Sequence, residues 1–173
     1  MKIVLLGYMG SGKSTIGKLI AETLGYTFKD LDAYIEKKEE MRIPDIFSEK
    51  GEIYFRKKET AYLKAILKEN NNIVIATGGG TPCYGDNIET LLDSEDVLTV
   101  YLKASIAILT DRLFEELKQR PLIAHLETKP LLNDFIRKHL FERAFYYNKA
   151  KIVQDTDFDT PKKITEKLVA KLL

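Results

Sequence analysis

Short apolar runs alternate with longer amphipathic segments along this chain. We predict strands at 2–7, 26–32, 72–80, 96–104 and 150–156, because each reads as a short extended run. Apolar residues recur at helical spacing between these runs, which predicts helices at 13–24, 52–70, 105–119 and 160–173. Strands that alternate with helices in this way are typical of an α/β fold with a doubly wound parallel sheet flanked by helices.

One stretch departs from the alternation. Residues 119–133, "QRPLIAHLETKPLLN", look irregular and lie between two helical segments. A loop of this length in a compact domain often forms a lid over a binding site. In the helical segment that follows, the aromatic residues are spaced as one stripe, which we interpret as facing the core: Phe141, Phe145, Tyr146 and Tyr147.

The composition is that of an ordinary globular chain. Of its 173 residues 45% are apolar and 31% are charged, which favours a single domain over residues 1–173. The net charge of +1 gives no electrostatic reason to expect nucleic acid or a membrane surface as a partner. The single cysteine, Cys83, cannot form an internal disulfide, and the first apolar run is too short for a signal peptide. We therefore expect a cytoplasmic protein, and a monomer, because no exposed apolar stripe stands out.

The strongest local motif is "GYMGSGKST", residues 7–15, between the first strand and the first helix. It matches the phosphate-binding loop, in which glycines let backbone N–H groups surround a polyphosphate at a helix N-terminus. Lys13 would reach the β- and γ-phosphates and the Ser14 hydroxyl would ligate Mg²⁺. The alternative is a glycine-rich turn with a surface lysine. The strand–loop–helix context favours a site for a nucleoside triphosphate.

A pair of carboxylates ends the second predicted strand. Asp30 and Asp32 are two residues apart, so on a strand they would point to the same face. Ligands of open parallel sheets bind at the carboxyl ends of the strands, where the phosphate-binding loop also lies. The two carboxylates would then face Mg²⁺ and an acceptor hydroxyl. The alternative is a solvated turn that only caps a helix beginning near Ala33.

Two further features point to an anionic ligand. Glu52, Arg56 and Glu59 share one face of a predicted helix, and the aromatic Phe47 and Phe55 lie close in sequence to the arginine. A surface ladder of ion pairs would explain that spacing, but an arginine beside apolar rings suits a small carboxylated ring better. The third strand ends in glycines, Gly78–Gly80, which either allow a ligand to approach the backbone or make a tight turn.

Together these motifs resemble the shikimate kinases over nearly the whole chain. The phosphate-binding loop, "DLD", "IFSEKGEIYFRKKE" and "TGGG" occur in the order and spacing of that family. The resemblance implies a five-stranded parallel sheet like that of nucleoside monophosphate kinases. It also implies a substrate-binding segment at about residues 32–60 and a lid at about residues 113–133. The implied reaction converts ATP and shikimate, with Mg²⁺, into ADP and shikimate 3-phosphate.

The resemblance also implies roles for residues of the acceptor site. Asp32 would contact the substrate hydroxyls and act as the base, while Asp30 would hold the metal through water. Arg56 and Arg143 would pair with the shikimate carboxylate, and Glu59 would orient Arg56. Glycines would line the substrate: Gly78, Gly79 and Gly80.

On the nucleotide side, Lys13 would stabilise the transferred phosphoryl group and Arg120 of the lid would close over the phosphates. Lys129, in "KPLL", is the alternative lid cation. Arg112 would pack on adenine, with residues 154–161 as the adenine loop. The implied nucleotide-binding residues are Gly10, Ser11, Gly12, Lys13, Ser14, Thr15, Arg112 and Arg120, with Ser14 and Asp30 at the metal.

Two other functions remain open from the sequence. One is another small-molecule kinase on the same scaffold, such as a gluconate kinase, although the carboxylates, the arginine and the glycines suit a carboxylated ring. The other is a catalytically silent nucleotide-binding regulator, which loss of Lys13 or Asp32 would have suggested; both residues are present.

Overall fold

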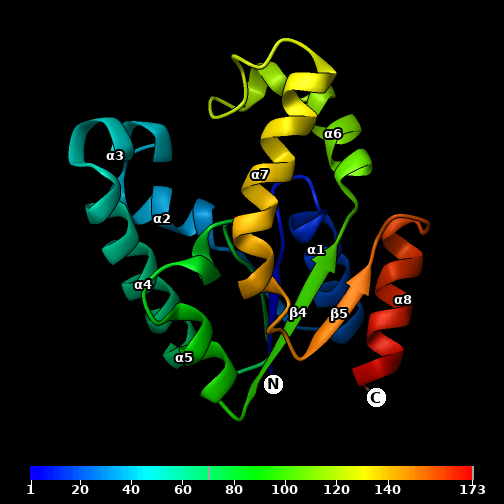
Figure 1. The fold of residues 1–173 in the computed structure, drawn as a ribbon. Helices are drawn as coiled ribbons and strands as arrows, with labels where there is room; N and C mark the ends of the chain where they lie inside the picture. The colour runs from blue at the N-terminus through cyan, green and yellow to red at the C-terminus, as the bar shows by residue number, and fades with distance from the viewer. Residues whose placement is uncertain (70, 173) are drawn as a thin grey trace.

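A computed structural model describes residues 1–69 and 71–172. Its sheet has five strands in the order β2-β3-β1-β4-β5, and every neighbouring pair is parallel. The predicted doubly wound parallel sheet is therefore confirmed (Figure 1). The strands are β1 (Lys2–Leu6), β2 (Thr27–Asp30), β3 (Ile73–Ala76), β4 (Val97–Lys103) and β5 (Ile152–Asp155).

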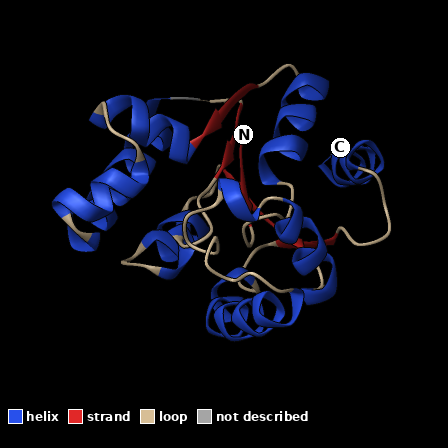
Figure 2. Ribbon diagram, turned by 90° about the horizontal axis from the view of Figure 1, so that it is seen from above, coloured by secondary structure: helices blue, strands red, loops and turns tan. Residues whose placement is uncertain are grey.

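Helices connect the strands and cover both faces of the sheet (Figure 2). The α-helices are α1 (Lys13–Leu24), α2 (Leu31–Glu39), α3 (Ile43–Lys50), α4 (Glu52–Glu69), α5 (Asn87–Asp93), α6 (Ile106–Glu115), α7 (Lys129–Tyr147) and α8 (Pro161–Leu172). The 3₁₀ turns are η1 (Thr81–Cys83) and η2 (Leu117–Gln119). All four predicted helices are present, although the last residues of two of them, Asn70 and Leu173, lie outside the described residues.

The sheet separates two apolar clusters, since successive strand residues point to opposite faces. Ile3 and Leu5 of β1 pack in one cluster with residues of α1 and α8, such as Ile20 and Leu168. Val4 and Leu6 point to the other face. There they join a larger cluster that includes residues of α2, α4, α5, α6 and α7. This second face carries the segments expected to bind the acceptor.

The second strand is shorter than predicted. β2 ends at Asp30, and Leu31, which is fully buried, begins α2. The Asp30 carboxylate itself starts this helix, because it accepts a hydrogen bond of 3.2 Å from the backbone N–H of Ala33. Asp32 therefore lies in the first turn of a helix, and the expectation that the two carboxylates share one face of a strand is wrong.

The aromatic stripe on α7 is only partly in the core. Tyr147 is fully buried, but Phe141 and Phe145 are 84% and 66% exposed. Leu132 and Ile136, one turn apart, are buried and define the inner face of this helix. The interpretation of Phe141 and Phe145 as core residues is therefore wrong, because the helix turns them outward.

The irregular stretch between α6 and α7 is shorter than predicted. Thr128 caps α7, its hydroxyl accepting from the backbone N–H of Leu131, so the helix already begins at Lys129. Within the connection, Ile123 is fully buried and anchors it to the larger apolar cluster. Among the described residues, the helices include none that is both long and apolar enough to cross a membrane.

Candidate active site

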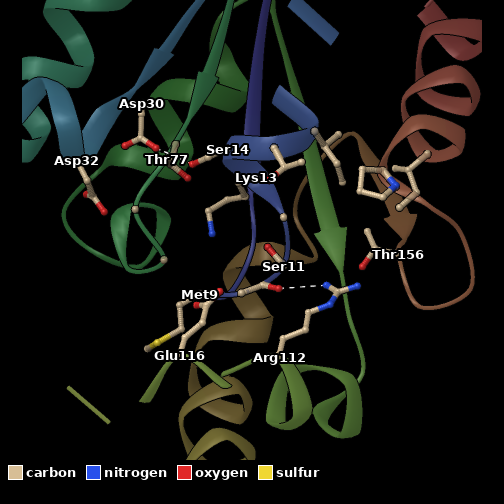
Figure 3. Close-up of a pocket in the computed structure, with 18 of the residues that line it drawn as sticks. Met9, Ser11, Lys13, Ser14, Asp30, Asp32, Thr77, Arg112, Glu116 and Thr156 are labelled. Carbon is tan, nitrogen blue, oxygen red and sulfur yellow. Dashed lines mark hydrogen bonds between the residues drawn. The ribbon is translucent and has the colours of Figure 1, made fainter. Parts of the chain in front are cut away.

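A cavity of about 700 Å³ lies at the carboxyl ends of β1, β2 and β3. Figure 3 shows Asp30 and Asp32 on one side of Lys13, and Arg112 and Thr156 on the other. The structure brings most of the predicted site residues to this cavity, where its lining includes Gly10, Ser11, Gly12, Lys13, Ser14, Thr15, Asp30, Asp32, Gly78, Gly79, Arg112 and Arg120.

The phosphate-binding loop joins β1 to α1. Gly12 precedes the helix with a left-handed φ of 95°, a conformation that residues with a Cβ rarely adopt. The Lys13 ammonium donates to the backbone oxygens of Gly7 (2.6 Å) and Tyr8 (3.0 Å). Burial lowers the pKa of Lys13 to about 8, although the Asp32 and Asp30 carboxylates oppose that shift. A bound polyphosphate would add negative charge here and favour the charged ammonium.

Ser14 and Asp30 form the candidate metal site. The Ser14 hydroxyl donates a hydrogen bond of 2.6 Å to the Asp30 carboxylate, whose other oxygen caps α2. The sequence suggested that Asp30 either caps a helix or faces the cavity. Its side chain does both, since one oxygen caps α2 and the other accepts from Ser14. In the part of the chain that the structure describes, no cluster of at least three His, Cys, Asp or Glu side chains could hold a metal. A hydroxyl and a nearby carboxylate fit Mg²⁺, which usually keeps waters and substrate phosphates among its ligands.

Asp32 is the carboxylate with the most altered acidity at the site. Its pKa is raised from 3.8 to about 6, mainly by burial and then by the nearby carboxylates of Asp30 and Glu59, while Lys13 opposes the rise. Oδ1 of Asp32 approaches the glycine turn after β3 so closely that a Cβ on Gly78 would lie 2.8 Å from it. A carboxylate with a pKa near neutrality can accept a proton from a bound hydroxyl.

Arg56 is held by carboxylates of its own helix, α4. Nη1 donates to Glu59 at 2.9 Å, and Nε lies 3.7 Å from Glu52. Glu59 is only 1% exposed, and its other carboxylate oxygen accepts from the Thr81 hydroxyl at 2.9 Å. The ion pairs of the alternative interpretation, a ladder of charges, are present, but they are not a surface ladder, because Glu59 is buried and Arg56 is partly buried. Glu59 therefore fixes Arg56 against the turn that carries Thr81.

The second arginine reaches the same turn from α7. A Cβ on Gly79 would lie 3.0 Å from Nη1 of Arg143, and one on Gly80 would lie 3.2 Å from its Nη2. The same Cβ on Gly80 would lie 2.9 Å from both Nη atoms of Arg56. Arg56, Gly80 and Arg143 are not part of the lining of the 700 Å³ cavity. The glycine turn connects these residues to the cavity, because Gly78 and Gly79 do line it. The two guanidinium groups therefore lie beside the cavity.

The nucleotide side has cations of its own. Arg112 donates from Nη1 to the backbone oxygen of Gly10 at 3.1 Å, beside the phosphate-binding loop. Arg120 lines the cavity and pairs with Glu116 at 2.6 Å. Lys129 does not line the cavity and pairs with Asp111 at 3.2 Å. From the predicted adenine loop, the lining includes Thr156, Asp159 and Pro161.

Some residues at the site were not predicted. Thr77 follows β3 directly, and its place at a strand end was a usable signal. Tyr147 donates through its hydroxyl to the Gly79 backbone oxygen at 2.5 Å. Tyr84 packs against Arg56, with Cζ of the arginine 3.8 Å from the ring centroid. Neither tyrosine had a signal in the sequence, because both contacts depend on tertiary packing.

The family profile and the curated relatives identify the family of this chain. The family profile described as "Shikimate kinase" matches residues 9–173. The chain is 49% identical over 149 residues to the shikimate kinase of Flavobacterium johnsoniae, covering 86% of each chain. The crystal structure of shikimate kinase from Bacteroides thetaiotaomicron is similar to it with a TM-score of 0.92 and 35% identity, covering 99% of this chain and 98% of that one.

The shikimate kinase of Acinetobacter baumannii, solved in complex with shikimate, matches with a TM-score of 0.86 and 32% identity, covering 99% of this chain and 92% of that one. The sequence matches span most of the chain, and the two structural matches each cover 99% of it. The phosphate-binding loop, the carboxylates and the paired arginines therefore lie in a chain that belongs to the shikimate kinase family.

Proposed function

We propose that this protein transfers the γ-phosphoryl group of ATP to the 3-hydroxyl of shikimate, giving shikimate 3-phosphate and ADP. The family to which the chain belongs carries this activity. One observation in the site supports it above all. Arg56 and Arg143 both reach Gly80, and the turn that contains this glycine also contacts Asp32. A small ring with a carboxylate on one side and hydroxyls on the other suits this arrangement.

At the acceptor end, Arg56 and Arg143 bind the carboxylate of the acid and so fix the direction of the ring. Asp32 accepts the proton of the attacking hydroxyl. The hydroxyl oxygen then forms a bond to the γ-phosphorus while the bond to the β,γ-bridging oxygen breaks, and ADP leaves with that bonding pair. The proton on Asp32 passes to solvent after the product departs.

At the nucleotide end, the backbone N–H groups from Gly10 to Thr15 surround the β-phosphate. Lys13 and Arg120 offset the negative charge on the transferring group. Ser14 and Asp30, the latter through water, would hold Mg²⁺, which would supply positive charge to the phosphate oxygens when bound. Arg112 covers the adenine. Closure of the segment at about residues 113–133 excludes water, which would otherwise compete as the acceptor.

The protein is proposed to act as a cytoplasmic monomer that uses no nucleic acid or membrane partner. ADP release by the purified chain with Mg²⁺-ATP tests the activity, with shikimate, gluconate or no acceptor. Release that depends on shikimate supports the proposal. Release that depends on gluconate would favour another small-molecule kinase, and release without any acceptor would leave only nucleotide binding and hydrolysis.

A further inference from the structure

An aromatic ring from outside the predicted site covers the guanidinium group of Arg56. The Cζ atom of Arg56 lies 3.8 Å from the ring centroid of Tyr84, against 5.1 Å for Phe55 and 6.0 Å for Phe47. Phe47 and Phe55 pack on each other with their ring centroids 4.7 Å apart. A distance of 3.8 Å corresponds to direct stacking, so Tyr84 is the ring in closest contact with the arginine.

The turn after η1 brings Tyr84 to this position. Gly85, which follows it, has a left-handed φ of 56° and reverses the chain. The backbone N–H of Asn87 donates to the backbone carbonyl oxygen of Tyr84 at 3.4 Å. The Asn87 side chain, fully buried, donates to the backbone carbonyl oxygen of Thr81 at 2.9 Å. The backbone on both sides of Tyr84 is therefore fixed, although its side chain is partly open to solvent, the residue being 37% exposed.

Arg56 needs support in addition to its ion pairs. Nη1 is bonded to Glu59, but Nε is buried and has no hydrogen-bond partner among the described residues. One hydrogen bond and the longer ion pair of Nε with Glu52, at 3.7 Å, leave the guanidinium plane more freedom to tilt than a two-point pair would. A ring stacked on its face removes this freedom while leaving the N–H groups at the edge available to a carboxylate.

We propose that Tyr84 is a positioning residue for the acid substrate. By stacking on Arg56 it sets the plane in which the guanidinium meets a carboxylate, and so it contributes to the choice of an anionic acceptor. This inference rests on the proposed function, in which Arg56 binds the carboxylate of shikimate. Tyr84 contacts the arginine, and Arg56 makes the contact with the acid.

Three replacements of Tyr84 separate stacking from other roles. Tyr84→Leu removes the aromatic face and is expected to raise the KM for shikimate about three- to thirtyfold, with kcat and the KM for ATP changing less than about twofold. Tyr84→Phe keeps the face and should restore the shikimate KM to within about threefold of the original chain. Phe141→Leu, which removes a ring that is 84% exposed on α7, is the matched control for loss of an exposed aromatic side chain.

The third replacement of Tyr84, by tryptophan, reports binding of the acid without measuring turnover. The chain contains no tryptophan, so Tyr84→Trp creates a single fluorescent reporter whose ring can also stack on a cation. We expect its emission to change with added shikimate, saturating near the shikimate KM, and not with gluconate. This variant also decides the question if Tyr84→Leu fails to fold, which thermal melting would reveal.

Failure of the inference differs from failure of the proposed function. If the original chain shows no ADP release that depends on shikimate, the proposed function fails and Tyr84 has no acid to position. If that chain is active but Tyr84→Leu has an unchanged KM for shikimate, only the role of Tyr84 is overturned. The same holds if the emission of Tyr84→Trp does not change at saturating shikimate. Equal rises in the KM values for shikimate and ATP would also overturn it, since they indicate a structural role.

Discussion

Asp32 lies against Gly78, so that a Cβ atom on the glycine would stand 2.8 Å from Oδ1 of the aspartate. This contact joins the first turn of α2 to the end of β3 and leaves no room for a side chain between them. The carboxylate is partly buried near Asp30 and Glu59, and burial followed by these two charges raises its pKa to about 6. The missing side chain at Gly78, in the turn after β3, thus lets the base of the proposed reaction pack against that turn.

Asp32→Asn tests the base directly. The amide has nearly the same shape but does not accept the proton, so we expect kcat to fall by about 10²-fold or more, in line with the loss of a positioned base. Binding of ATP, measured by calorimetry, should remain within about threefold of that of the original chain. Near-normal turnover in this variant would remove Asp32 from the role of base.

The same substitution should stabilise the fold at neutral and alkaline pH. The folded pKa of Asp32, about 6, lies above its ordinary value of 3.8, so the folded chain binds more protons between these values. The free energy of unfolding therefore falls as pH rises through this window, and above pH 6 the buried charge costs about 2–3 kcal/mol.

Urea titrations of both proteins check this cost. Asp32→Asn should be more stable than the original chain by about 1–3 kcal/mol at pH 8, and the gain should disappear at about pH 4. A gain of the same size at both pH values would indicate a packing effect rather than removal of a charge.

Arg56→Ala should weaken the acid substrate far more than the nucleotide. A charge-assisted contact to the carboxylate is lost, and the buried Glu59 loses the partner that lies 2.9 Å away. We expect the KM for shikimate to rise by about 10²-fold while the KM for ATP stays within about threefold, in initial-rate measurements. Equal weakening of both substrates would point to a folding role for Arg56.

Gly80→Ala tests whether the position of the two arginines governs binding of the acid. Gly80 has φ −90° and ψ −11°, so alanine fits its backbone without strain, but the new Cβ would lie 2.9 Å from both Nη atoms of Arg56. The guanidinium ends must shift, and we expect a shikimate KM raised about tenfold or more with little loss of thermal stability. An unchanged KM would mean that the position of the two arginines does not govern binding of the acid.

Arg120→Ala and Lys129→Ala form a matched pair for the lid cation. Arg120 lines the cavity, whereas Lys129 pairs with the exposed Asp111 away from it. We expect kcat to fall about 10²-fold or more for Arg120→Ala and less than about twofold for Lys129→Ala. The reverse order, measured as single-turnover rates with saturating substrates, would make Lys129 the cation that reaches the phosphates.

The sheet and the phosphate-binding loop were predictable because local sequence determines them. Apolar strands such as Lys2–Leu6 and glycines at left-handed positions such as Gly12 leave few alternatives. The end of β2 was not predictable from its extended pattern, because the Asp30 side chain competes with the strand by capping a helix. The face of α7 was also misjudged. Helical spacing groups Phe141 with Phe145 but does not say which face meets the core.

The arrangement of the acceptor site depends on contacts that are distant in sequence. Arg143 reaches Gly79 and Gly80 from α7, and the stacking of Tyr84 on Arg56 depends on the turn at Gly85. No periodic pattern encodes such contacts. The resemblance to a family indicated the arginines, but it gave no reason to single out Tyr84.

The most direct test of the central claim is the position of the phosphate on the product. Phosphorus NMR of a reaction with shikimate and Mg²⁺-ATP, with proton coupling to locate the ester, identifies the oxygen that accepted the phosphoryl group. The account predicts one new phosphate ester, on the 3-oxygen of shikimate, in an amount equal to the ADP formed. Inorganic phosphate in place of the ester, or an ester at another hydroxyl, would contradict it.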